Sequence, residues 1–210
     1  MLTITTAGIV RRVPDDLPVL HFESREALAA WLAEHCESAR GCWLKLAKAG
    51  ASAGSVSYAE AIELGLAHGW IDGQKRALDG EFWLQRFTPR GPKSRWSRIN
   101  RDKAMALIES GRMTPPGLAA VEQAKADGRW ERAYEGAATI TVPDDLRRAL
   151  DANSEAAAAF ATLDGSNRYA VLYRIGDAKK PETRARRIEQ YVAMLARGET
   201  LHPRSGSSRR

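Results

Sequence analysis

The sequence has few of the residues that build the commonest catalytic and metal centres. It contains two cysteines and four histidines in 210 residues, and the histidines are scattered. Cys36 and Cys42 lack the second pair that a zinc site needs, so we interpret them as reduced cysteines, with a disulfide or redox pair as the alternative. The His-Glu-x-x-His, Gly-x-Ser-x-Gly and glycine-rich phosphate-loop motifs are missing. We therefore expect no metal, no cofactor and no common hydrolase or kinase, while an unusual enzyme stays open.

Long apolar runs are also missing. No stretch approaches the roughly 18 apolar residues of a membrane helix. The segment 1–16 lacks the basic start, apolar core and cleavage site of a secretory signal. Both absences predict a cytoplasmic protein without membrane insertion. A hydrophobic content of 44% and a charged content of 28% are ordinary for a globular chain of one large or two small domains.

Periodicity and turn residues predict an α+β fold with a small, largely antiparallel sheet in the first part of the chain. Ser57 and Glu60 have the spacing of a capping box, and Asp79-Gly80 is a strong hairpin signal. The expected order is a helix capped by Ser24, strand 42–48, a helix from Ser57 to His68, hairpin strands 70–78 and 81–88, and helices 98–110 and 115–128.

From Val142 onward the composition changes to short, alanine-rich helices. We expect these helices to begin near Pro143, Ser154, Ser166 and Pro181, each a residue type that favours a helix start. The chain is thus predicted to contain an α+β module at 1–135, a small helical module at 136–200 and a disordered basic tail at 201–210.

Positive charge is concentrated in the segment 86–103. It holds seven basic residues and one acid, a net charge of +6 that equals the formal net charge of the whole chain. Guanidinium groups bind phosphate or carboxylate in bidentate fashion, a helix N-terminus adds unpaired amides, and Trp96 could stack on a ligand ring. We therefore predict a ligand site here. Its expected residues are Asp72, Arg86, Arg90, Lys93, Ser94, Trp96, Ser97 and Asn100.

Two interpretations of this basic segment stay open. In one, the cations bind an anion or nucleic acid, which would offset the unfavourable effect of basic residues on the helix dipole. In the other, Arg86 and Arg90 pair with Asp72, Asp79 or Glu81 across the hairpin and the remaining cations are solvated.

Asp72 is a further candidate, because Gly73 beside it would let a ligand or backbone approach closely. His68 could form an acid–base pair with Asp72. We do not expect the two to meet, since His68 ends a helix and Asp72 lies on a strand. The alternative for Asp72 is an ion pair with an arginine of the basic segment.

A second basic face is expected where the last helix begins. Residues 178–187 hold five basic residues and one acid. Arg184 and Arg187 share one side of the helix, and Lys179 and Lys180 precede it. This face could contact a phosphate backbone, or it could be solvated or paired within the fold.

Three long segments resemble a known family: GWIDGQKRALDG…QRFTPR…KSRWSRIN, GRMTPPGLAAVEQAKADGRWERAY and NRYAVLYRIGDAKKPETRARRIEQYVAML. They resemble the YdeI/OmpD-associated family, also called the bacteriocin-protection or OmdA-like family, from about Phe22 to Gly198. The resemblance implies resistance to bacteriocins or other envelope stress, and the name implies an outer-membrane association. It implies no reaction and no catalytic residue.

Together, residues and resemblance predict a cytoplasmic stress-protection protein, and they favour a binding protein over an enzyme. We expect it to present a basic, tryptophan-bearing pocket to a small anionic ligand. A nucleic-acid-binding protein and an enzyme acting on a small anionic metabolite are the alternatives.

Overall fold

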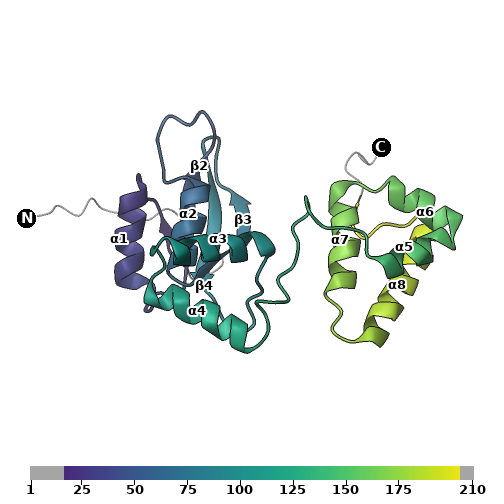
Figure 1. Cartoon of the computed structure of the whole chain (residues 1–210). Coiled ribbons are helices and arrows are strands. Elements are labelled where there is room, and N and C mark those ends of the chain that lie inside the picture. The colour runs from purple at the N-terminus through teal and green to yellow at the C-terminus, as the bar shows by residue number, and fades with distance from the viewer. Residues whose placement is uncertain (1–16, 204–210) are drawn as a thin grey trace, which may run out of the picture. The chain divides into compact units, whose positions relative to one another are not determined.

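The computed structural model describes residues 17–203, and these form two compact units (Figure 1). Among the described residues, the first unit contains 17–96 together with 100–133, and the second contains 97–99 and 134–203. Two segments lie outside the described residues. They are residues 1–16, which lack the features of a secretory signal, and residues 204–210, which make up most of the predicted disordered tail.

The first unit is built on a four-stranded mixed sheet in the order β1-β2-β4-β3. Its strands are β1 (Val19–Leu20), β2 (Cys42–Ala47), β3 (Trp70–Ala77) and β4 (Phe82–Pro89). β1 runs parallel to β2, and the other pairs are antiparallel. The predicted α+β fold and hairpin are therefore confirmed. The two-residue strand β1 was not predicted, because so short an element has no detectable periodicity.

Four helices accompany this sheet: α1 (Arg25–His35), α2 (Tyr58–Ala67), α3 (Arg98–Glu109) and α4 (Pro115–Ala126). The predicted caps of the first two are present. Ser24 accepts a hydrogen bond from the amide of Ala27, and Ser57 with Glu60 forms the full capping box. These local signals decide where each helix begins because they satisfy amides that the helix itself leaves unpaired.

The two faces of the sheet have different surroundings. Alternate strand residues point to opposite faces. Leu44, Trp70 and Phe87 join side chains of all four helices in the main core. Trp43 and Leu84 point the other way and form a separate cluster, to which no described helix contributes.

The contact between α2 and α4 depends on a very close approach of their backbones. The carbonyl of Ala67, at the end of α2, accepts hydrogen bonds from both the amide and the hydroxyl of Thr114. A Cβ atom placed on Gly117 would lie 2.2 Å from that carbonyl oxygen. Glycine is thus the residue that this helix crossing accommodates.

The second unit contains α5 (Asp144–Asp151), α6 (Ser154–Ala161), α7 (Gly165–Gly176) and α8 (Pro181–Ala196), as the helical prediction for this part of the chain required. Two expected caps are wrong. Asn153, rather than Ser154, accepts from the amide of Ala156, and Asp164, rather than Ser166, accepts from the amide of Asn167. Asn153 and Asp164 precede the predicted serines in the chain and are better hydrogen-bond acceptors. The Asp164 carboxylate also complements the helix dipole.

The buried side chain of Asn167 fixes the end of the described chain. Its amide nitrogen donates to the carbonyl of His202, and its carbonyl oxygen accepts from the amide of His202. Leu201 packs against the helical core. Residues 201 and 202 therefore belong to the second unit.

Candidate functional site

The basic segment meets the aromatic core through Arg90 and Trp96. The guanidinium carbon of Arg90 lies 3.6 Å from the centre of the Trp96 ring. Its Nη1 donates to the carbonyl of Arg95 at 3.1 Å. Trp96 is only 2% exposed, and the Trp130 ring packs edge-on against it at 4.9 Å. A ligand ring could stack on Trp96, as the sequence suggested, only after Arg90 moves.

The indole of Trp96, like that of Trp43, carries a buried polar group without a partner among residues 17–203. Its Nε1 is buried and has no hydrogen-bond acceptor in the part of the chain that the structure describes. Leaving a buried donor unsatisfied costs about 1–3 kcal/mol. This donor lies beside the cation of Arg90, so the surroundings favour an acceptor with negative charge.

The loop between β4 and α3 is held by Ser94. Its hydroxyl accepts from the amide of Gly91 at 3.0 Å, and its carbonyl accepts from Nη1 of Arg129 at 2.7 Å. Arg129 also pairs with Asp127. Sequence reasoning missed Arg129, because it is 35 residues from Ser94 and has no local pattern. Lys93, at the outer side of the loop, is exposed.

The hairpin carboxylates that were candidate partners of the arginines have other contacts. Asp79 accepts from the amides of Glu81 and Phe82 and thereby closes the turn, and these bonds hold the pKa of Asp79 below its usual value. Glu81 accepts from the amide of Ser52. Arg86 is half-buried on β4, in register with Trp43 of β2.

Asp72 lies in a cluster that the sequence did not predict. Its carboxylate accepts a 2.7 Å hydrogen bond from the hydroxyl of Tyr58, and burial together with this bond raises the pKa of Tyr58. Tyr58 packs edge-on against Trp83. The register of β3 shifts just after Asp72, and the amide of Gln85 donates to the carbonyl of Gly73 there. Gly73 thus lies within the irregular part of β3, where the register shifts.

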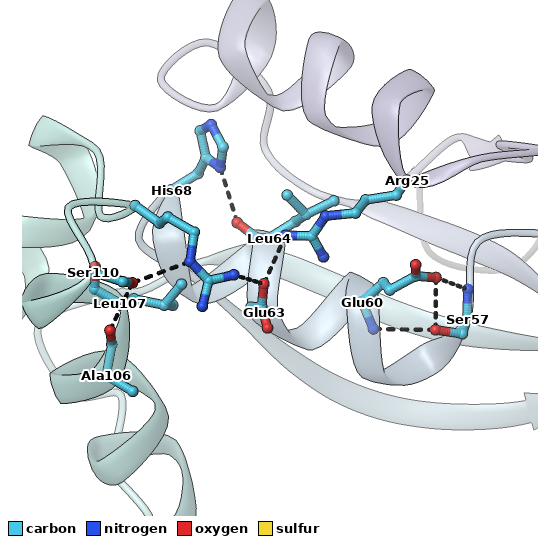
Figure 2. Close-up of polar contacts among 10 residues, drawn as sticks. Arg25, Ser57, Glu60, Glu63, Leu64, His68, Ala106, Leu107 and Ser110 are labelled. Carbon is cyan, nitrogen blue, oxygen red and sulfur yellow. Dashed lines mark hydrogen bonds and ion pairs between the residues drawn. The ribbon is translucent and has the colours of Figure 1, made fainter.

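His68 makes its hydrogen bond elsewhere than at Asp72, as expected from the sequence. Its Nδ1 lies 2.9 Å from the carbonyl of Leu64, within its own helix (Figure 2). On the same helix, one carboxylate oxygen of Glu63 accepts from Arg25 at 2.6 Å and from Arg112 at 2.7 Å. Glu63 therefore links α2 to α1 and to the turn after α3, which is a structural role.

The beginning of α3 is shared between the units. Ser97 belongs to the second unit, where it forms an isolated bridge with Tyr134, and Arg98 pairs with Glu135 at 2.7 Å. Asn100 is half-buried and belongs to the first unit. Seven of the eight predicted ligand residues thus lie in the first unit, and Ser97 lies in the second.

The second basic face divides into half-buried and exposed parts. Arg184 donates to both carboxylate oxygens of Asp145 and to the carbonyl of Ile175. Arg187 donates to the carbonyl of Arg174. Both arginines therefore satisfy carbonyls at the end of α7, where the helix dipole favours cations. These contacts favour the paired interpretation for both arginines. Lys179 and Lys180 are exposed.

Residues 17–203 contain no metal-ligand cluster and no helix suited to a membrane. No group of three or more histidine, cysteine, aspartate or glutamate side chains within this range is placed to hold a metal ion. None of the helices in it combines the length and the apolar character needed to cross a membrane.

Comparison with known proteins divides the chain in a similar way. Residues 20–120 match a domain of unknown function (DUF8412), and residues 139–198 match the family described as "Bacteriocin-protection, YdeI or OmpD-Associated" (OmdA). No curated protein and no solved structure matches the chain. The family predicted from the sequence is confirmed, although its model covers the helical region and the first half matches a different model. Residues 139–198 are thus similar to the bacteriocin-protection, YdeI or OmpD-associated family, and this match suggests a bacteriocin-protection type of function.

Proposed function

We propose that this protein acts in bacteriocin or envelope-stress protection, within the cytoplasm, by binding a small anionic ligand at the basic segment of its first unit. The buried indole N–H of Trp96, which has no acceptor among the described residues, is the observation that carries this proposal. A ligand oxygen would satisfy that donor, and Arg90 beside it would supply the charge.

The surrounding residues fit a carboxylate or phosphate group. Arg90 lies against the Trp96 ring, and Arg129, 14% exposed at its side chain, reaches the same loop through the carbonyl of Ser94. Lys93 is exposed at the loop and could meet an anion as it approaches. Asn100, which is half-buried, completes the proposed site in the first unit, whereas Arg86 shares the sheet face of Trp43 and Leu84, opposite to the main core that contains Trp96.

Burial of the donor favours a small ligand over a nucleic acid. A phosphate in a polymer backbone is held among neighbouring sugars and reaches exposed cations most easily. The Trp96 donor is buried, so an acceptor that enters the loop must be compact. Nucleic-acid binding would instead use the exposed cations and would weaken steeply as the salt concentration rises.

Tryptophan emission of the full chain tests the proposal, with a panel of small carboxylates and phosphate esters and a short single-stranded DNA at two salt concentrations. We expect saturable binding of a small anion that changes the emission and persists at physiological salt. Trp96→Phe keeps a ring in the core but removes the N–H, and we expect it to weaken binding at least tenfold, the effect of about 1.4 kcal/mol.

Trp130→Phe is the matched control, because it changes the other ring of the same aromatic pair. It should bind like the unaltered protein. Equal binding by Trp96→Phe and the unaltered protein would refute the role of the indole donor. Binding of DNA alone, abolished at physiological salt, would favour the nucleic-acid alternative.

A further inference from the structure

A cluster of aromatic and charged side chains lies at the outer strand of the sheet, outside the basic segment 86–103. It consists of Tyr58 at the start of α2, Asp72 and Lys75 on β3, and Trp83 on β4. The register of the hairpin places Asp72, Lys75 and Trp83 on one face of the sheet, because their partners alternate along the strands. Tyr58 and Lys75 are exposed and the other two are half-buried, so a ligand from solvent can reach the cluster.

The carboxylate of Asp72 is met by neutral donors alone. Its Oδ2 accepts from the hydroxyl of Tyr58 at 2.7 Å and from the amide of Gln85 at 3.5 Å. Burial and this bond raise the pKa of Tyr58, so the phenol keeps its proton and remains a donor. Among residues 17–203, Asp72 forms no ion pair and its Oδ1 accepts no hydrogen bond. That oxygen is therefore open to a charged donor.

The ring of Trp83 already carries an ammonium group. Nζ of Lys75 lies 4.2 Å from the centre of this ring, and the Tyr58 ring packs edge-on against it with 5.5 Å between the ring centres. The face of an indole attracts cations, but the attraction is weak where the cation is exposed to water. Lys75 thus marks a position for an ammonium group and can be displaced from it.

We propose that Tyr58, Asp72 and Trp83 form a site for a small primary ammonium ion, the group that ends a lysine side chain, and that Lys75 occupies this site until the ligand displaces it. Tyr58 bonds to Asp72 through its hydroxyl and contacts Trp83 through its ring, so the carboxylate and the indole flank one phenol. A primary ammonium has three donors, and it can rest on the indole while it makes a charge-assisted bond to Asp72. The ligand has the opposite charge to the anion proposed for the Trp96 site.

The experiment is a titration of the nitrogen-15-labelled full chain with n-butylammonium chloride, at ionic strength held constant with sodium chloride. Each of the six tryptophans gives one indole N–H resonance, and Trp83→Phe identifies that of Trp83. We expect a saturable shift of the Trp83 resonance and none of Trp96, so this site and the anion site succeed or fail separately. A blocked Gly-Lys-Gly peptide, run in parallel, distinguishes a lysine side chain from a free amine as the source of the ammonium group.

Asp72→Asn keeps the shape of the side chain but removes its charge, and we expect binding to weaken about tenfold or more. Lys75→Gln removes the internal occupant and should tighten binding about threefold, an effect that a purely structural lysine would not produce. Glu122→Gln changes an exposed carboxylate of α4 and should bind like the unaltered protein.

The proposal is wrong if neither the unaltered protein nor Lys75→Gln shows a saturable Trp83 shift. Unchanged binding by a folded Asp72→Asn would equally overturn it. If Asp72→Asn does not fold, Lys75→Gln decides alone, because binding that is weaker than or equal to that of the unaltered protein would show that Lys75 does not occupy the site.

Discussion

Arg90 covers the face of Trp96, with its guanidinium carbon 3.6 Å from the ring centre. The backbone amide of Arg90 also donates to the carbonyl of Gly69. One residue thus joins the end of β4, the start of β3 and the aromatic core. A cation–π contact of this kind contributes about 0.5–2 kcal/mol, so Arg90 stabilises the fold besides being a candidate ligand residue.

Arg90→Ala should separate these two roles. We expect it to abolish binding of the small anion while lowering the free energy of unfolding by about 1–2 kcal/mol, because its backbone hydrogen bond remains. Urea unfolding and the tryptophan titration measure the two effects. Lys103→Ala removes an exposed cation of α3 and should alter neither. If Arg90→Ala abolishes soluble expression, the residue is structural and its assignment to a binding site is wrong.

Gly117→Ala should strongly destabilise the first unit. The added Cβ would lie 2.2 Å from the carbonyl oxygen of Ala67, and that oxygen is fixed by two hydrogen bonds from Thr114. Separating α4 from α2 would break both bonds, so we expect a loss of about 3 kcal/mol or more in urea unfolding. Gly54→Ala, where a Cβ meets nothing within 4 Å, is the control. Near-equal stability of the two variants would contradict the close packing described for α2 and α4.

The bond between Arg184 and Asp145 should make the second unit sensitive to acid. The Arg184 side chain holds the pKa of Asp145 below its usual value. A carboxylate with a lowered folded pKa contributes stability above its unfolded pKa of about 4, and that contribution is lost as the pH falls through the folded pKa. We expect Asp145→Asn to be less stable at pH 7 by about 1 kcal/mol, since both side chains are about a third exposed.

The stability difference between Asp145→Asn and the unaltered protein should shrink below pH 4, as measured by thermal unfolding at several pH values. Asp144→Asn changes the neighbouring, exposed carboxylate and should have a smaller effect at pH 7. A constant difference for Asp145→Asn across the whole pH range would show that its charge is not what stabilises the unit.

Two equally buried tryptophans allow a direct measurement of one hydrogen bond. Trp43 is 0% exposed and its Nε1 has no partner among the described residues, whereas Trp70, 1% exposed, donates to the carbonyl of Cys36 at 3.0 Å. Both replacements by phenylalanine lose similar ring area. Trp70→Phe should therefore be less stable than Trp43→Phe by about 1 kcal/mol in urea unfolding. The reverse order would show that differences in packing outweigh the hydrogen bond.

Local sequence signals predicted most of the secondary structure. Ser57 and Glu60 satisfy amides within one helical turn, and Asp79 closes the hairpin within three residues, so these features depend on close neighbours alone. The predicted caps Ser154 and Ser166 were wrong for the same kind of reason, because Asn153 and Asp164 lie nearby and are used instead. The change in composition at Val142 likewise predicted a helical second unit.

The sequence by itself determined the α+β character, the resemblance to a known family and the concentration of positive charge at 86–103. Only the tertiary structure decided which cations serve the fold and which donors stay buried without a partner. Arg129 meets Ser94 across 35 residues and Arg184 meets Asp145 across 39, and the burial of Trp96 depends on elements packed from elsewhere in the chain. Burial and pairing are properties of three-dimensional neighbours, and a one-dimensional pattern of residue types does not contain them.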